Sequence, residues 1–193
     1  MQTKIILASS SPFRKQLLDR LHLDYDCHSP NIDETIASDE DASSYVCRLA
    51  RLKAEQVAMR YPEATVIGSD QCALLGEKIL GKPESHENAL QQLLAAQGKT
   101  MIFHTAICVL NLSTEFSAVE DVVFEVEFRN LSDQQLGHYL RVEQPYQCAG
   151  SFKAEGYGAC LFNSMRGDDP TSLIGLPLLK LTRMLESAGV EVV

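Results

Sequence analysis

The chain has 193 residues, 45% apolar and 22% charged, which is the composition of an ordinary globular protein and excludes a disordered one. Its 17 basic and 26 acidic residues give a net charge of −9, which argues against non-specific binding to long nucleic acid because such binding needs a broad positive face. A small anionic ligand in a local basic pocket remains compatible with this charge. The first apolar run, at 5–8, is too short for a signal peptide, and no later run reaches membrane-spanning length. Six scattered cysteines without a C-x-x-C pair favour a reduced, cytoplasmic protein and argue against a zinc site.

The first predicted elements are a buried strand at 4–8 and a helix that begins at Pro12, with Ser11 as its cap. A strand, a small-residue turn and a helix N-terminus together form a ready anion site, because backbone N–H groups point outward at the positive end of the helix dipole. Arg14 and Lys15 fall in the first turn, where the dipole alone disfavours cations. A bound phosphate would explain the two cations, and the alternative is two solvated side chains.

A second strand is predicted at 25–29, followed by an acidic loop at 30–41, most of whose acids are expected to face solvent. Apolar residues at helical spacing then predict a long helix at 42–61. Lys53 falls in the middle of the apolar stripe of this helix. The lysine either snorkels to an edge or reaches a polar cavity, and a cavity would imply a nearby anion because burying an unpaired ammonium is costly.

The stretch 65–83 carries the densest group of candidate functional residues. Its pattern predicts a strand that ends at Asp70 and a tight hairpin, with a turn at Gly76, that carries Lys82. An acid at a strand end can bind a divalent metal or accept a proton from water, and a lysine suits a phosphate. The alternative is an aspartate in a turn and a lysine beside a proline.

The second half of the chain is predicted to contain further helices and long strands. They are a helix at 85–97, a hairpin of strands at 100–112 and 115–128, a helix at 132–142, a short strand at 159–162 and one final helix from Thr171. The glycine-rich segment 143–158 is expected to be a binding loop, with a long surface connection as the alternative. The sequence contains neither a P-loop, nor a dinucleotide-binding glycine pattern, nor a G-x-S-x-G nucleophile elbow.

Seven stretches resemble, in order and over nearly the whole chain, the Maf family of nucleotide pyrophosphatases, in particular its branch that hydrolyses 7-methyl-GTP. They are LASSSPFRKQLL (7–18), the acidic loop around Glu34, LARLKA (49–54), GSDQ (68–71), GKP (81–83), CAGSFKAEGYG (148–158) and IGLPLL (174–179). The resemblance implies a single α/β domain over 1–193, similar to inosine triphosphatase, with a mixed twisted central sheet flanked by helices and two lobes around a nucleotide cleft. It also implies cleavage between the α- and β-phosphates, giving a nucleoside monophosphate and diphosphate, with Mg²⁺ or Mn²⁺ as cofactor.

The resemblance assigns a role to each matching position. Asp70 matches the family's proton acceptor, and our hypothesis is that Asp70 and Glu34 hold the metal; whether Asp70 acts mainly as base or as metal ligand stays open. Binding of the substrate is assigned to Ser9, Ser11, Arg14, Lys15, Lys53 and Lys82. Substrate choice is assigned to Phe13, Gln71 and Glu155.

One position departs from the pattern of the branch, which resembles SPWR where this chain has SPFR. A 7-methylguanine ring carries positive charge, and the aromatic face of Phe13 can hold it by cation–π attraction, less well than tryptophan. The departure therefore bears on affinity more than on the branch. The carboxylate of Glu155 suits guanine because it can accept from the ring N–H and amino donors.

Two other functions compete with this enzyme. A nucleotide-binding regulator of cell division would need the phosphate-binding lysines but has no evident need for Asp70. A house-cleaning pyrophosphatase would accept other modified nucleotides through Phe13 and Glu155. In each case we expect a small-molecule nucleotide as the partner, without long nucleic acid or a membrane. The sequence does not decide the oligomeric state, and a homodimer is one alternative.

Overall fold

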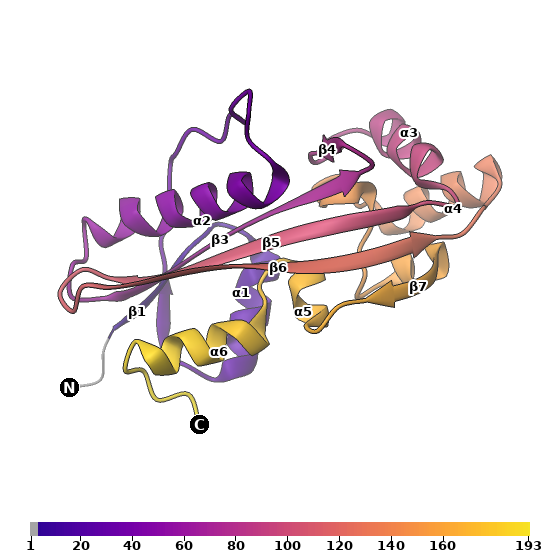
Figure 1. Ribbon diagram of the computed structural model, residues 1–193. Helices are drawn as coiled ribbons and strands as arrows, with labels where there is room; N and C mark the ends of the chain where they lie inside the picture. Colours follow the sequence, from indigo (N-terminus) through magenta and orange to yellow (C-terminus); the bar gives the residue numbers. More distant parts are fainter. Residues whose placement is uncertain (1–3) are drawn as a thin grey trace. The chain divides into compact units, whose positions relative to one another are not determined.

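The computed structural model describes residues 4–193, which form a mixed sheet with helices (Figure 1). The seven strands follow the order β2 (Tyr25–Cys27), β1 (Ile5–Ala8), β3 (Thr65–Leu75), β5 (Thr100–Asn111), β6 (Phe116–Phe128) and β7 (Phe162–Arg166), with β4 (Lys78–Leu80) paired to β3. The chain divides into two compact units, the first ending at 70 and resuming at 105–122 and 169–193, the second formed by 71–104 and 123–168. Three long strands contribute residues to both units: β3 (Thr65–Leu75), β5 (Thr100–Asn111) and β6 (Phe116–Phe128). The prediction of a mixed sheet flanked by helices is confirmed, whereas the single domain over 1–193 stays a prediction.

In the first unit, helices cover both faces of the sheet (Figure 1). The central strand β1 (Ile5–Ala8) pairs in parallel with β2 (Tyr25–Cys27) on one side and with β3 on the other. Helix α2 (Ala42–Ala58) lies on one face, and α1 (Pro12–Leu18) and α6 (Leu178–Ser187) lie on the other. Burial on both faces explains why all four residues of β1 are apolar and inaccessible to solvent.

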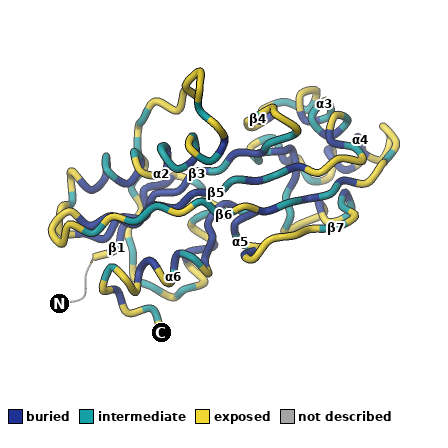
Figure 2. Tube along the Cα trace, in the orientation of Figure 1, coloured by how far each residue is buried: buried dark blue, intermediate teal, exposed yellow. Residues whose placement is uncertain are grey.

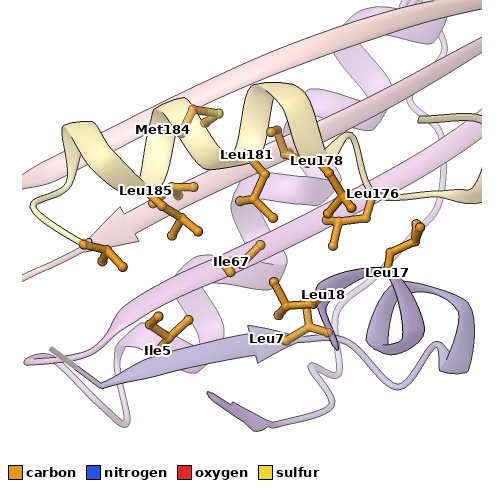
Figure 3. Packing of buried hydrophobic residues seen from close by; sticks show 13 residues of the cluster. Ile5, Leu7, Leu17, Leu18, Ile67, Leu176, Leu178, Leu181, Met184 and Leu185 are labelled. Carbon is orange, nitrogen blue, oxygen red and sulfur yellow. The ribbon is translucent and has the colours of Figure 1, made fainter. Parts of the chain in front are cut away.

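The face of the sheet under α1 and α6 is closed by a continuous apolar cluster (Figure 3). Alternate residues of the strands point into it, because successive side chains of a strand face opposite sides. The cluster includes Ile5, Leu7, Leu17, Leu18, Ile67, Leu176, Leu181 and Leu185. Figure 2 shows the same region as buried along β1 and the first half of β3.

The opposite face of β3 lies unusually close to α2. A Cβ atom on Gly68 would lie 2.1 Å from the Ala50 carbonyl oxygen and 2.9 Å from the Ala54 nitrogen. The glycine is therefore needed for packing, and the strand continues through it to Leu75. The expectation that the strand ends at Asp70 was wrong, because small residues that suggested a turn are present to admit the helix.

The second unit confirms several locally encoded elements. The strand β4 (Lys78–Leu80) pairs antiparallel with β3 across the predicted turn at Gly76. Ser85 caps α3 (His86–Ala96). Ser132 and Gln135 form a capping box at the start of α4 (Asp133–Glu143).

The segment after α4 differs from its prediction. It contains two short 3₁₀ helices, η2 (Ala149–Ser151) and η3 (Tyr157–Leu161), and β7 (Phe162–Arg166) begins where the short strand 159–162 was expected to end. A Cβ on Gly158 would lie 2.2 Å from the Lys153 carbonyl oxygen, so the chain folds tightly back on itself there. Edge-to-face aromatic contacts anchor this segment: Phe152 stacks against Phe103, Phe128 and Phe162.

The expected final helix is in fact two helices. The chain forms α5 (Pro170–Ile174), breaks, and then forms α6. Gly175 has a φ of +122°, which favours glycine, and Pro177 lies two residues later, directly before the first residue of α6. In α6, Leu178 and Leu181 are buried, whereas Leu179 is 57% exposed.

Two further features concern the described residues as a whole. Over residues 4–193 the helices are too short or too polar to cross a membrane. The six cysteines all lie in this range and form no disulfide.

Candidate functional site

The first unit brings Lys53 and Asp70 into direct contact. Asp70 follows Gly68 by two positions along β3 and therefore points to the same face, toward α2. Lys53 lies on the buried face of α2, and its Nζ is 2.5 Å from Asp70 Oδ1. The two side chains are only 9% and 11% exposed. The anion that the position of Lys53 implied is thus a carboxylate of the protein itself.

A second carboxylate reaches the same ammonium. Glu34 Oε1 is 2.7 Å from Lys53 Nζ, and the Glu34 side chain is 57% exposed. This finding agrees with the expectation that most acids of the loop 30–41 face solvent, and it adds a contact that no sequence pattern indicated. One lysine therefore joins a buried acid to an acid at the surface.

Arg14 adds a second cation to this cluster. Burial lowers the pKa of its guanidinium, while the Asp70 and Glu34 carboxylates oppose that shift. Arg14 Nε donates a hydrogen bond to the Gly175 carbonyl oxygen at 2.9 Å, and Ser69 Oγ donates to the same oxygen at 3.1 Å. The turn between α5 and α6 thus fixes the arginine and the strand residue next to Asp70.

Ser69 and Gly175 were not predicted as site residues. A serine hydroxyl has many uses, and the glycine lay in a segment interpreted as a continuous helix. The glycine and proline of IGLP carried a signal for a helix break, which would have indicated a carbonyl group without a partner inside a helix at this turn.

The remaining predicted residues of the first unit have distinct local roles. Ser9 Oγ accepts from the Ser11 nitrogen at 3.1 Å, and Ser11 Oγ accepts from the Arg14 nitrogen at 3.4 Å, which confirms Ser11 as the cap of α1. Phe13 is half-buried. Lys15 is exposed, and its charge acts on the thiol of Cys27, whose pKa is nevertheless raised, chiefly by burial.

The second unit contains Gln71, Lys82 and Glu155. Gln71 is half-buried in β3, Lys82 is exposed just beyond β4, and Glu155 is exposed between η2 and η3. The backbone around Glu155 is held by Glu143: its Oε1 is 3.0 Å from Lys153 Nζ, and its Oε2 accepts from the Tyr157 nitrogen at 2.8 Å. The roles assigned to these three residues, and the binding-loop interpretation of 143–158, stay predictions.

The first unit also offers oxygen ligands for a divalent cation. Within residues 4–193, no group of three or more His, Cys, Asp and Glu side chains could hold a metal ion by itself. Asp70 and Glu34 nevertheless supply two carboxylates within reach of one ammonium. Mg²⁺ commonly uses one or two carboxylates and completes its shell with water and substrate phosphates. The pair therefore fits a cation that binds together with a polyphosphate.

The fold places the chain in a known structural class. The Ham1 protein of Staphylococcus aureus superposes with a TM-score of 0.55 at 18% identity, over 96% of this chain and 100% of that one. A HAM1 protein from Coxiella burnetii gives a TM-score of 0.51 at 16% identity, with the same coverage. At this level of identity the comparison establishes a shared fold alone.

The sequence comparisons are more specific. Residues 4–188 match the family described as Maf-like protein. The "7-methyl-GTP pyrophosphatase" of Nitrosococcus oceani is 52% identical over 190 residues, covering 97% of this chain and 94% of that protein. Its namesake from Pseudomonas aeruginosa is 50% identical over 188 residues, covering 97% and 98%. The chain belongs to the Maf family.

Proposed function

We propose that the protein is a nucleoside triphosphate pyrophosphatase that hydrolyses 7-methyl-GTP to 7-methyl-GMP and diphosphate. The observation that carries this proposal is the roughly half-identical sequence, over nearly the full length of both chains, of relatives that bear the name of this activity. The cluster of Lys53, Asp70 and Glu34 supports it, because the cluster combines a cation for phosphate with carboxylates for a metal and for a proton.

The proposed role of the cations is to neutralise the triphosphate. Arg14 and Lys53 lie together in the first unit, and Lys15 and Lys82 are assigned the same role. A guanidinium can bind two phosphate oxygens at once, whereas an ammonium acts as a point charge. Such a local group of cations offsets the repulsion between an anionic substrate and a chain whose net charge is −9.

In the proposed reaction, the oxygen of a water molecule forms a bond to the α-phosphorus. The bond from the α-phosphorus to the oxygen that bridges to the β-phosphorus breaks, and diphosphate leaves. Asp70 accepts a proton from the water, while Lys53 fixes the orientation of this carboxylate through its bond to Oδ1. Mg²⁺ or Mn²⁺, held by Asp70 and Glu34, would supply additional positive charge to the phosphate oxygens.

Substrate choice is assigned to three side chains. The half-buried ring of Phe13 offers an aromatic face to the cationic 7-methylguanine ring. Glu155 is exposed and can accept from the N–H donors of guanine. Gln71, the residue after Asp70, completes the set.

The proposal is tested with a panel of nucleoside triphosphates. The purified protein is incubated with 7-methyl-GTP, GTP, dTTP or UTP and with Mg²⁺ or Mn²⁺, and diphosphate and phosphate are quantified separately. We expect diphosphate from 7-methyl-GTP at a rate well above that from the others. Release of diphosphate mainly from a different nucleotide would support the proposed reaction but contradict 7-methyl-GTP as the substrate. Nucleotide binding without release of diphosphate or phosphate would favour a regulator.

A further inference from the structure

Glu34 lies on an irregular loop, so its position depends on side chains from other parts of the fold. Residues 28–41, which the structure describes in full, contain neither a helix nor a strand, and Figure 2 shows this loop as largely exposed. Ordering such a segment has a large entropic cost, so a carboxylate on it is held in place only if other groups hold the backbone. The contact between Glu34 and Lys53 therefore raises the question of what fixes the loop.

Two side chains of α2 bind the loop backbone at Glu34 itself and at the next residue. The hydroxyl of Tyr45 donates to the Glu34 carbonyl oxygen at 3.0 Å. Arg48 Nη2 donates to the Thr35 carbonyl oxygen at 3.1 Å. The Arg48 guanidinium also lies over the Tyr45 ring, 5.7 Å from its centroid, so the two side chains support each other.

Arg48 also binds the far end of the loop. Its Nε and Nη2 donate to the two carboxylate oxygens of Glu40, each at 2.6 Å. This is the bidentate geometry of a strong arginine–carboxylate pair. Glu40 Oε2 in turn accepts from the Ala37 nitrogen at 3.2 Å. One arginine thus connects the backbone beside Glu34 to the carboxylate that organises the turn at 37–40.

The spacing along α2 explains why these contacts serve the site. At about 100° per residue, Tyr45, Arg48 and Gln56 share one side of the helix, and Lys53 lies on the neighbouring part of its surface. Gln56 closes the other end of the loop, accepting from the Asn31 nitrogen at 2.5 Å. A single helix therefore presents Lys53 to Asp70 and also holds the backbone of the residue whose carboxylate meets Lys53.

We infer that Arg48 and Tyr45 are positioning residues, which hold the Glu34 carboxylate at Lys53 and Asp70 for binding a polyphosphate with its divalent cation. The inference rests on the proposed function. Neither side chain needs to touch the substrate, since each acts through the Glu34 loop. Removing either is expected to leave the fold of α2 intact and to release the carboxylate.

A double-mutant cycle separates positioning from a general structural effect. We expect Arg48→Met to lower kcat/KM for the active nucleotide by about tenfold to hundredfold, as is typical for groups that orient a ligand residue. In a Glu34→Gln background the same change should lower kcat/KM by less than about twofold, because the carboxylate that Arg48 positions is already gone. Losses that multiply in the double variant would overturn the inference.

Arg51→Met is the matched control. Arg51 is exposed on the same helix, and its charge acts on the thiols of Cys47 and Cys108, which have no proposed role in the reaction. Removing Arg51 should therefore leave kcat/KM unchanged. Arg48→Lys keeps the charge but not the paired donors, and we expect it to restore only part of the lost activity.

A second measurement needs no activity. Amide hydrogen exchange of residues 33–40 is recorded on the protein without nucleotide. We expect Arg48→Met to accelerate exchange there, most clearly at Ala37, and Arg51→Met to leave it unchanged. Equal exchange in wild type and Arg48→Met would overturn the inference. The wild-type protein could also prove inactive while exchange in the loop still depends on Arg48. That result would contradict the proposed function, but it would still support Arg48 as the residue that holds the Glu34 loop.

Discussion

Lys53 and Asp70 form a buried ion pair, and such a pair is weak evidence for stability. Removing both charges from water costs about as much as their attraction returns, whereas removing one partner leaves an uncompensated charge. The pair is therefore better explained by chemistry at this position than by folding. Because Lys53 also binds Glu34, its loss would affect two carboxylates at once.

Lys53→Met is expected to lower the free energy of unfolding by about 3 kcal/mol, because Asp70 would remain buried without its cation. Urea denaturation measures this change. Lys15→Met is the control, since Lys15 is exposed in the same unit, and its effect should stay within about 0.5 kcal/mol. The double variant Lys53→Met/Asp70→Leu should recover most of the loss. Equal stability of the two single variants would contradict this account of the pair.

The close packing of α2 on β3 sets the position of the site at the scale of elements. Gly68 lets the helix approach, and the same face of the strand then presents Asp70 to Lys53. On the other face, the break between α5 and α6 presents the Gly175 carbonyl to Arg14 and Ser69. Two glycines thus determine where the charged side chains meet.

Gly68→Ala tests this packing directly. The added methyl group would overlap the backbone of α2, so we expect destabilisation by about 2 kcal/mol, or about 6 °C in Tm for a chain of this size. Gly81→Ala is the matched control, because a Cβ there meets no atom within 4 Å. Calorimetric Tm values that are the same for both variants would show that α2 can move without cost.

The loop that carries Glu34 should respond to acid. Hydrogen bonding with Arg48 lowers the pKa of the Glu40 carboxyl below its ordinary value of 4.5. A group whose pKa is lower in the folded state stabilises that state above its unfolded pKa, and the effect is lost as the pH falls through the folded pKa. The Arg48 Nε–H resonance in NMR spectra should thus be constant above about pH 5 and shift below it. A shift that persists in Glu40→Gln would contradict this assignment.

Local signals made much of the fold predictable. Ser11 caps its helix as expected, and Ser85 and Ser132 cap two later helices in the same way, because a cap depends on residues three positions away. Lys53 was identifiable because a cation on an apolar stripe needs a partner. Two boundaries were assigned wrongly because of glycines. Gly68 suggested a turn at the end of a strand, whereas it lets α2 pack closely on that strand. Gly175 lies at a break between two helices, and the leucines around it suggested one continuous helix.

The contacts of Tyr45 and Arg48 could not be predicted from the sequence. Their hydrogen bonds run from side chains to backbone carbonyls of an irregular loop, and such bonds leave no periodicity or motif. The family resemblance identified Glu34 without indicating what holds it. The structure supplied that part of the site.

At the scale of the whole molecule, the chain consists of two compact units that share three long strands. The first unit holds Arg14, Glu34, Lys53 and Asp70, and the second holds the residues assigned to substrate choice other than Phe13. Family membership over 4–188 covers both. The proposed hydrolysis therefore depends on Asp70, the acid in closest contact with the cations.

The most direct test is diphosphate release from 7-methyl-GTP by Asp70→Asn over a titration of Mg²⁺ or Mn²⁺ up to saturation, with thermal unfolding measured on the same sample. A proton acceptor at this position predicts a fall in kcat of about 10² to 10⁴-fold. A mainly metal-binding role predicts a raised metal requirement, with kcat restored at high metal concentration. Near-normal turnover at ordinary metal concentration by a folded variant would contradict the account.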